Sequence, residues 1–320
     1  MTKSYDIFNG DADGLCALHQ LRLETPCAAE LVTGVKRDIR LLDRIDAREG
    51  DTLTVLDVSM KRNAAALRRA LASGARVRYF DHHAPGEIPQ HPALEAHVDT
   101  APDVCTSLIV DRHLGGRHRM WAVVAAFGDN LVQSAVAAAQ PLGLDLTERA
   151  RLHELGECLN YNAYGDTVDD LHYHPADLYR TLERYRDPRH FIFDEPVFNV
   201  LRTAYAEDLY RAHETAPCTQ SDQLAVFILP DAAWSRRING LFGNRLAQSH
   251  PKRAHAVLVT KGNGYRVSVR APLERPQGAA ALCERFSTGG GREGAGGIDD
   301  LPESDLDRFV SAMREAFSAP

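Results

Sequence analysis

The chain has 320 residues, a formal net charge of −7 and a hydrophobic content of 44%. This length exceeds the usual size of one domain, so we expect two domains, and the apolar content suffices for a core in each. The acidic balance argues against binding of duplex nucleic acid, which needs a basic face. No stretch approaches the roughly 20 apolar residues of a membrane-spanning helix, so we expect no membrane partner.

The six cysteines are scattered, with no Cys-x-x-Cys pair. This pattern indicates neither a zinc ribbon nor a disulfide framework, and free thiols are typical of a reducing compartment. Residues 1–5 lead directly into a β-prone run, without the apolar segment of a signal peptide. We therefore expect a cytoplasmic protein.

Strand-like runs alternate with helical patterns over the first hundred residues. The expected strands cover residues 5–9, 30–35, 52–58, 76–80 and 96–98, and the expected helices cover residues 15–23, 39–45 and 61–73. Strands that alternate with helices imply right-handed crossovers and a parallel sheet. Their continuous apolar character is typical of strands that are covered on both faces.

The rest of the chain divides into a helical part and a smaller mixed part. We expect helices between residues 107 and 153, a polar loop over residues 160–174, and helices over 178–185 and 197–213. Beyond Ser221 the expected strands cover residues 224–229, 254–260 and 264–270, and the expected helices cover 238–248, 278–286 and 304–317. The fold class is therefore α/β, with a catalytic domain over residues 1–190, a helical linker over 191–220, and a mixed α/β domain over 221–320.

Acidic residues follow several of the expected strands. The first strand leads into Asn9-Gly10-Asp11-Ala12-Asp13-Gly14, the third reaches Asp57, and the fourth ends in Asp81-His82-His83. Ligand sites of open α/β sheets lie outside the carboxyl ends of strands. Side chains two apart in an extended chain point the same way, so Asp11 and Asp13 would face one locus. The alternative is an acidic turn in which Asp13 caps the next helix.

These acids would share a centre with Asp129, which follows an apolar helical run. Carboxylates that lie so close together raise one another's pKa or require cations. Carboxylate and imidazole ligands suit a divalent ion such as Mn²⁺ or Zn²⁺. Two such ions roughly 3.5–4 Å apart are the usual apparatus for attack of water on phosphorus. No Ser-His-Asp arrangement and no Walker loop competes with this interpretation.

These motifs resemble those of the DHH phosphoesterase superfamily in order and spacing: Gly10 to Gly14, Asp57, Asp81-His82-His83 and Phe127-Gly128-Asp129. The resemblance implies a two-ion Mn²⁺ site, with Mg²⁺ or Co²⁺ as substitutes. It implies metal ligands and catalytic groups at Asn9, Asp11, Asp13, Asp57, His82, His83 and Asp129.

The resemblance also assigns roles to these residues. Asp11 and Asp13 would each bind a different ion, Asp57 would bridge both ions, and Asp129 would complete the second ion's site. His82 would be a ligand or lie beside the scissile phosphate, and His83 would orient the leaving group or the metal shell. Asp81 would support the histidines from behind.

Two positions depart from the family pattern. Arg292 stands where many members carry a histidine after the glycine run of residues 287–297, which favours a more anionic or differently placed ligand terminus. Asn9 stands where many members have a histidine, and an amide oxygen ligates less strongly than imidazole. Either the first ion binds weakly, or Asn9 contacts substrate.

The second half resembles the DHH-associated C-terminal domain through the glycine run Ser287 to Gly297. This resemblance implies an active site in the cleft between the domains and a substrate-binding set of Ser268, Arg270, Gly289, Gly290, Gly291 and Arg292. We interpret the glycine run as a nest of backbone N–H groups for an anion, with a flexible loop as the alternative.

The expected function is Mn²⁺-dependent hydrolysis of phosphoester bonds in a small nucleotide or short single-stranded oligonucleotide, such as pAp, nanoRNA or a linear dinucleotide. One alternative is a single-strand exonuclease of the RecJ kind, which would need a basic, aromatic-lined channel. A second is a catalytically weak nucleotide-binding sensor, because Asn9 replaces the usual histidine. Whether the chain forms a homodimer stays open.

Overall fold

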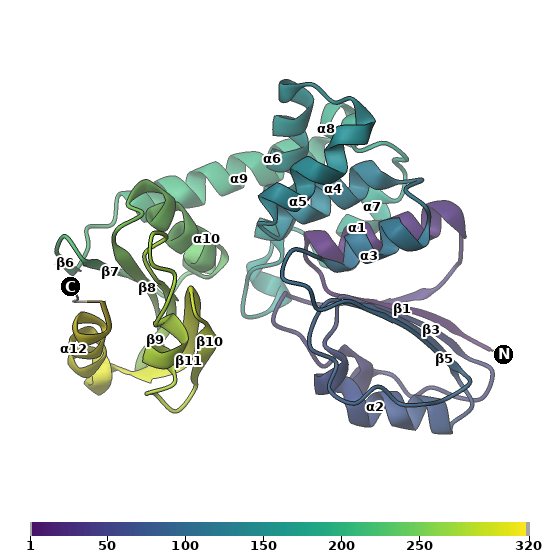
Figure 1. The fold of residues 1–320 in the computed structure, drawn as a ribbon, viewed down its shortest axis with the longest axis horizontal. Helices are drawn as coiled ribbons and strands as arrows, with labels where there is room; N and C mark the ends of the chain where they lie inside the picture. Colours follow the sequence, from purple (N-terminus) through teal and green to yellow (C-terminus); the bar gives the residue numbers. More distant parts are fainter. Residues whose placement is uncertain (1, 318–320) are drawn as a thin grey trace. The chain divides into compact units, whose positions relative to one another are not determined.

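The computed structural model describes residues 2–317. The chain forms two compact units, Met1–Thr203 and Ala204–Pro320, and the division falls within helix α9 (Pro196–His213). Each unit has its own sheet (Figure 1). Within the described residues, no helix is long and apolar enough to cross a membrane. All six cysteines are free.

The sheet of the first unit consists of five parallel strands: β1 (Ser4–Phe8), β2 (Glu30–Val32), β3 (Thr52–Leu56), β4 (Arg76–Asp81) and β5 (Leu94–Val98). Their order is β2-β1-β3-β4-β5, which confirms the expected parallel α/β sheet. The chain moves outward in one direction from β1 to β2 and then crosses back to β3. The order therefore reverses between β1 and β3, and ligands of such sheets bind at this point.

Helices cover both faces of this sheet, as Figure 1 shows for α2 (Met60–Ala72) on one face and α1 (Ala12–Glu24) and α3 (Thr106–His113) on the other. Successive strand residues point to opposite faces. Ile7 accordingly belongs to the core beneath α2, whereas Phe8 and Phe80 belong to the core beneath α1. The continuous apolar pattern of the strands follows from this double cover.

The helical part of the first unit contains α4 (Arg119–Gly128), α5 (Val132–Ala139), α6 (Leu146–Asn162), α7 (Pro175–Leu182) and α8 (Pro188–Asp194). Helix α8 was not expected from the sequence; Asp187 caps it and Pro188 occupies its first turn. Helices α4 and α6 meet at two glycines. A Cβ on Gly156 would lie 2.3 Å from the carbonyl oxygen of Val124 and 2.8 Å from the backbone nitrogen of Gly128.

The second unit is the expected smaller mixed α/β fold. Its strands are β6 (Thr219–Gln220), β7 (Leu224–Leu229), β8 (Ala254–Lys261), β9 (Gly264–Arg270), β10 (Gly289–Arg292) and β11 (Ala295–Pro302), in the order β10-β11-β9-β8-β7-β6. Its helices are α10 (Ala233–Ser249), α11 (Ala279–Cys283) and α12 (Leu306–Phe317). Among the described strands of this second sheet, β7 and β8 pair in parallel and the other neighbours pair antiparallel.

A buried histidine in the first unit predicts acid sensitivity. His19 is 1% exposed, donates to the carbonyl oxygen of Tyr185 and packs edge-on against Trp121. Burial lowers the pKa of His19 to about 4. The unfolded chain therefore binds one more proton between pH 6.5 and 4, and the free energy of unfolding should fall as the pH drops through this range, by at most about 1.4 kcal/mol per pH unit.

Urea unfolding at pH 7 and pH 5 checks this expectation. His19→Gln keeps an N–H donor and cannot titrate, so its free energy of unfolding should depend less on pH than that of the unaltered chain. Equal pH dependence in the two proteins would contradict the assignment.

Candidate metal centre

Asp11 and Asp13 follow β1, and helix α1 begins between them at Ala12. The prediction that these residues share an extended segment is therefore wrong, as is the alternative that Asp13 caps the helix. Asp11 is the cap, and its Oδ1 accepts the N–H groups of Asp13 (3.0 Å) and Gly14 (3.1 Å). The turn is tight because Gly14 approaches the Asn9 backbone, where a Cβ would lie 2.1 Å from a carbonyl oxygen.

The Asp13 carboxylate faces the N-terminus of α3. Its two oxygens accept the backbone N–H groups of Thr106 and Ser107, each at 2.7 Å. The backbone carbonyl oxygen of Asp13 accepts the Ser107 hydroxyl at 2.9 Å. The first N–H groups of a helix have no partner within the helix and carry partial positive charge. Helix α3 therefore holds Asp13 in one orientation at the switch point of the sheet.

Asp57 follows β3 in a left-handed backbone conformation, with φ of 57°. Non-glycine residues in this conformation carry backbone strain, and such residues cluster at functional sites. The Asp57 Oδ1 accepts the Thr106 hydroxyl at 3.2 Å and lies 3.4 Å from Nε2 of His82. The turn thus brings a buried carboxylate from β3 to the histidines that follow β4.

The two histidines are oriented by different acceptors. His82 donates from Nδ1 to the carbonyl oxygen of Val104 at 3.0 Å, which leaves Nε2 on the side of Asp57 and Asp129. His83 donates from Nδ1 to Oδ1 of the buried Asp81 at 2.7 Å. Asp81 also accepts the Met60 and His83 backbone N–H groups. Asp81 therefore contacts His83, whereas a backbone carbonyl orients His82.

Asp129 ends helix α4, and its Oδ2 lies 3.9 Å from Nε2 of His82. The ammonium of Lys36 contacts the opposite oxygen of Asp129 at 3.3 Å and Oδ2 of Asp11 at 2.5 Å. It also donates to Oδ1 of Asn160 at 3.2 Å. The backbone carbonyl of Lys36 accepts the side-chain N–H of Asn9 at 3.3 Å.

The sequence interpretation missed Lys36, Asn160, Thr106 and Ser107. Lys36 lies four residues beyond β2, so the same strand-end rule that selected Asp57 would have found it. Asn160 belongs to the polar segment whose role the sequence left open. Thr106 and Ser107 contact Asp13 mainly through backbone N–H groups, which a pattern of side chains in the sequence cannot predict.

Crowded buried acids shift one another's titration. Burial, and then the charges of Asp11 and Asp13, raise the pKa of Asp57 well above its ordinary value. Burial and Asp129 likewise raise the pKa of Asp13. Burial also raises the pKa of Asp11, but the Lys36 ammonium outweighs it and holds that pKa below its ordinary value. Asp11 and Asp129 contact the Lys36 ammonium, whereas for Asp13 and Asp57 it is the charge of His82 that opposes the rise in pKa.

Burial lowers the pKa of His82, but Asp57, Asp13 and Asp129 outweigh burial and raise that pKa to about 10. Two groups of ligand atoms that include His82 converge within 4.8 Å: one from Asp13, His82 and Asp129, and one from Asp57, His82 and His83. Carboxylate oxygen and imidazole nitrogen are the donor set that Mn²⁺ and similar ions accept. The residues around His82 thus fit a divalent ion.

In the second unit the glycine run is a β-hairpin, so its interpretation as a nest or a flexible loop is wrong. Strand β10 pairs with β11 in antiparallel register, and the glycine backbone groups take part in this ladder. Gly289 and Gly291 are required by packing, because a Cβ would lie 1.8 Å and 2.5 Å from neighbouring carbonyl oxygens. A Cβ on Gly290 would meet nothing within 4 Å.

The two arginines of the expected substrate-binding set differ. Arg270 donates to Asn244, to the Ser268 hydroxyl and to two backbone carbonyls, so Ser268 and Arg270 bind each other. Arg292 lies exposed on β10, which is the edge strand of the sheet. Arg292 and Gly290 therefore remain accessible to a ligand, whereas Arg270 is engaged within the unit.

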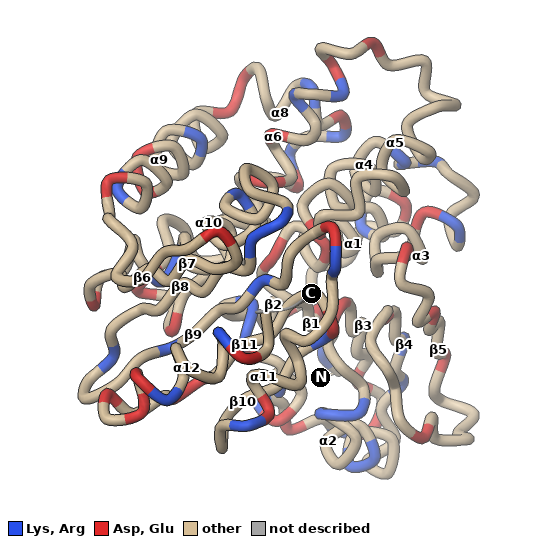
Figure 2. Tube along the Cα trace, turned by 60° about the vertical axis from the view of Figure 1, so that its left-hand side comes forward, with Lys and Arg blue, Asp and Glu red and all other residues tan. Residues whose placement is uncertain are grey.

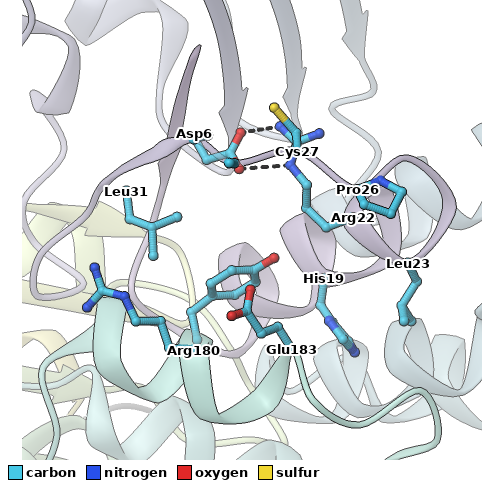
Figure 3. Close-up of a pocket in the computed structure, with 12 residues that line it drawn as sticks. Asp6, His19, Arg22, Leu23, Pro26, Cys27, Leu31, Arg180 and Glu183 are labelled. Carbon is cyan, nitrogen blue, oxygen red and sulfur yellow. Dashed lines mark hydrogen bonds and ion pairs between the residues drawn. The ribbon is translucent and has the colours of Figure 1, made fainter. Parts of the chain in front are cut away.

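A separate cavity of about 680 Å³ lies in the first unit between α1, the segment after it and α7. Figure 3 shows Arg22 bound to Asp6 through both carboxylate oxygens, with His19, Leu31 and Arg180 nearby. None of the acids and histidines of the candidate centre lines this cavity. Asp6 and Arg22 neutralise each other, so this pair does not provide an unpaired charge for binding a ligand in the cavity.

The fold and the centre together define an α/β protein with a cluster of acids and histidines at the switch point of a parallel sheet. No family model matches the chain, and no curated protein matches it. Solved structures do. Exonuclease RecJ bound to manganese is similar with a TM-score of 0.62 and 16% identity, over 99% of this chain and 91% of that one.

Two further structures share the fold. A DHH domain from a member of the s1p family of ribosomal proteins has a TM-score of 0.62 and 13% identity, over 98% of this chain and 86% of that one. The pGpG-specific phosphodiesterase PggH from Vibrio cholerae has a TM-score of 0.55 and 14% identity, over 98% of this chain and 99% of that one. The chain therefore has the fold of the DHH phosphoesterase superfamily, as the motifs predicted.

The glycine contact between α4 and α6 predicts a link between packing and metal binding. Gly156→Ala would force the two helices apart, at a cost of roughly 1–3 kcal/mol in the free energy of unfolding. Since Asp129 ends α4, the variant should also bind Mn²⁺ more weakly, as measured by titration calorimetry.

Ala150→Gly on the exposed face of the same helix is the control. It should cost about 1 kcal/mol of helix stability and leave Mn²⁺ affinity unchanged. An equal loss of affinity in both variants would mean that destabilisation alone weakens the centre.

Proposed function

We propose that the protein is a Mn²⁺-dependent phosphoesterase that hydrolyses small nucleotides or short single-stranded oligonucleotides. One observation carries this proposal: Asp13, Asp57, His82 and Asp129, from four distant segments, converge at the switch point of the sheet. Burial and neighbouring acids raise the pKa values of Asp13 and Asp57, which indicates a repulsion between carboxylates that a divalent ion would relieve.

When bound, such an ion would lower the pKa of water and withdraw charge from phosphoryl oxygens. The residues of the chain would prepare the reaction by fixing geometry. Helix α3 orients Asp13, and the Val104 carbonyl fixes the His82 tautomer so that Nε2 faces the acids. His83 is 44% exposed and tied to Asp81, which suits it to orient a leaving group.

The size of the substrate is argued from charge. Acidic and basic residues alternate along the chain, as Figure 2 shows for helix α9, and the net charge is −7. A long single strand would need a continuous basic groove with stacking aromatics. PggH, which is pGpG-specific by its description, matches over 99% of its own length. The charge distribution favours a dinucleotide-sized substrate over the exonuclease alternative, and PggH is an example of this fold that acts on such a substrate.

In the second unit, Arg292 and the open side of Gly290 support binding of the distal part of the substrate. A guanidinium can form two parallel hydrogen bonds with a phosphate. The free edge of β10 presents further backbone groups to an extended ligand. Binding energy from these groups would help to align the scissile phosphate.

Asp57→Asn is the sharpest test of the metal centre. Asparagine tolerates the left-handed conformation of residue 57, so the fold should survive. Without the carboxylate, Mn²⁺-dependent hydrolysis of a generic phosphodiester should fall by more than about 100-fold. Because a buried acid with a raised pKa is removed, the metal-free protein should be no less stable.

Asp177→Asn, at an exposed position on α7, serves as the matched control and should keep full activity. Retained hydrolysis in Asp57→Asn would remove the site assignment. If the unaltered protein binds Mn²⁺ but cleaves no pAp, pGpG or short RNA, the sensor alternative replaces the enzyme.

Arg292→Ala tests the role of the second unit. Loss of a charge-assisted hydrogen bond should raise KM for a dinucleotide by roughly tenfold or more. The KM for a small chromogenic phosphoester, which has no distal phosphate, should stay unchanged. The exposed Arg314→Ala on α12 is the control. Equal effects of Arg292→Ala on both substrates would count against this binding role.

A further inference from the structure

Lys36 lies among the acids at the position that the two-ion interpretation reserves for a metal. Its ammonium contacts Asp11 at 2.5 Å and Asp129 at 3.3 Å, and it donates to Asn160 at 3.2 Å. The ammonium is thus surrounded by three oxygen atoms, which come from three different segments and accept its hydrogen bonds. A small divalent ion between the same segments would bind the same kind of oxygen atoms.

The lysine is held in this position from several sides. Its backbone N–H donates to the carbonyl oxygen of Ala163 at 2.9 Å, and its carbonyl accepts the Asn9 amide at 3.3 Å. The ammonium lies 5.7 Å from the centre of the Tyr164 ring. Both the backbone and the charged end are therefore fixed, and the side chain is only 29% exposed.

The ligand groups divide in the same way. In the part of the chain that the structure describes, acid and histidine ligand atoms converge in three groups: two include His82, and the third consists of Glu95, His97 and His113. None of the three includes Asp11. Asp11 instead pairs with Lys36. Asn9, which replaces the histidine of the family pattern, donates to the lysine backbone, and its buried Oδ1 has no hydrogen-bond partner among the described residues.

We propose that the Lys36 ammonium permanently takes the place of one of the two cations, so that the centre binds a single divalent ion on the His82 side. This inference rests on the proposed metal centre and specifies how many ions it holds. The lysine supplies a fixed positive charge to Asp11 and Asp129. The single ion lies with Asp13, Asp57 and His82.

The choice of residue type agrees with this role. The chain has 37 lysines and arginines, and only five are lysine. A lysine ammonium is a compact point charge with three donors, whereas a guanidinium is a planar fork that reaches two oxygens in one plane. An ion surrounded by three oxygen atoms is therefore replaced more closely by lysine than by arginine.

The competing arrangement has Lys36 withdrawn and two ions bound. It is separated from the proposal by counting ions in the full-length chain. We expect 1.0 Mn²⁺ per chain after equilibration with excess manganese and removal of the unbound ion, and an electron paramagnetic resonance spectrum of isolated Mn²⁺. Two ions per chain with an exchange-coupled spectrum would overturn the proposal.

Variants of Lys36 test whether this lysine is what excludes a second ion. Lys36→Met removes the charge and keeps the length, and the double variant Asn9→His with Lys36→Met adds an imidazole ligand. We expect the double variant to bind two Mn²⁺ ions with an exchange-coupled spectrum. The exposed Lys252→Met is the control and should still bind one. A double variant that still binds one ion would overturn the proposal, because the lysine would then not be what excludes the second ion.

The experiments test the single-ion inference and the proposed function separately. One isolated ion without hydrolysis of any nucleotide would overturn the proposed function and support the inference. Two coupled ions with hydrolysis would support the function and overturn the inference. A chain that binds no manganese at all would overturn both.

Discussion

Repulsion among three buried carboxylates and a fourth, partly exposed one is the constraint on which the first unit depends. Asp11, Asp13, Asp57 and Asp129 arrive from three different segments, two of them at the ends of adjacent parallel strands. Burial without compensation would be costly, because each charge loses water and meets like charges. The hydrogen bonds and ion pairs that surround these carboxylates compensate this charge.

The acids are compensated by different contacts, except that Asp11 and Asp129 share the Lys36 ammonium. Asp13 receives two N–H groups from the start of α3, and Asp11 caps α1 and pairs with Lys36. Asp57 has a hydroxyl and His82 as neighbours. On the Lys36 side of the centre a cation of the chain itself balances the acids, whereas on the His82 side the proposed ion would balance them. Within the proposed single-ion arrangement, Asn9 would help to position Lys36, because its amide N–H donates to the Lys36 backbone carbonyl.

The packing around the centre explains how such different segments meet. Gly128 and Gly156 bring α4 and α6 into backbone contact, and a Cβ on Gly128 would lie 2.5 Å from Cβ of Ala12 at the start of α1. Asp129 therefore follows directly from a three-helix contact that admits no side chain larger than hydrogen. In the second unit, glycines serve the hairpin of β10 and β11 in a comparable way, and only Gly290 has open space around it.

The sequence by itself determined the elements that local pattern encodes. Continuous apolar runs predicted the parallel strands, and the acids at their ends predicted the residues that gather near His82. It failed where an interaction has no local signature. The helix start between Asp11 and Asp13 depends on the cap, and the hairpin in the glycine run depends on pairing with β11, which compensates for the low strand propensity of glycine.

Only the tertiary structure decided the charge balance of the centre. The position of Lys36 shortly after β2 marks it as a candidate site residue, but nothing in its neighbourhood of the sequence shows that it pairs with buried acids. Its meaning comes from Asp129 and Asn160, more than 90 residues away along the chain. Local sequence fixes which groups carry charge, but the energy of a buried charge depends on what lies within a few ångströms in space, and the packing of distant segments sets that.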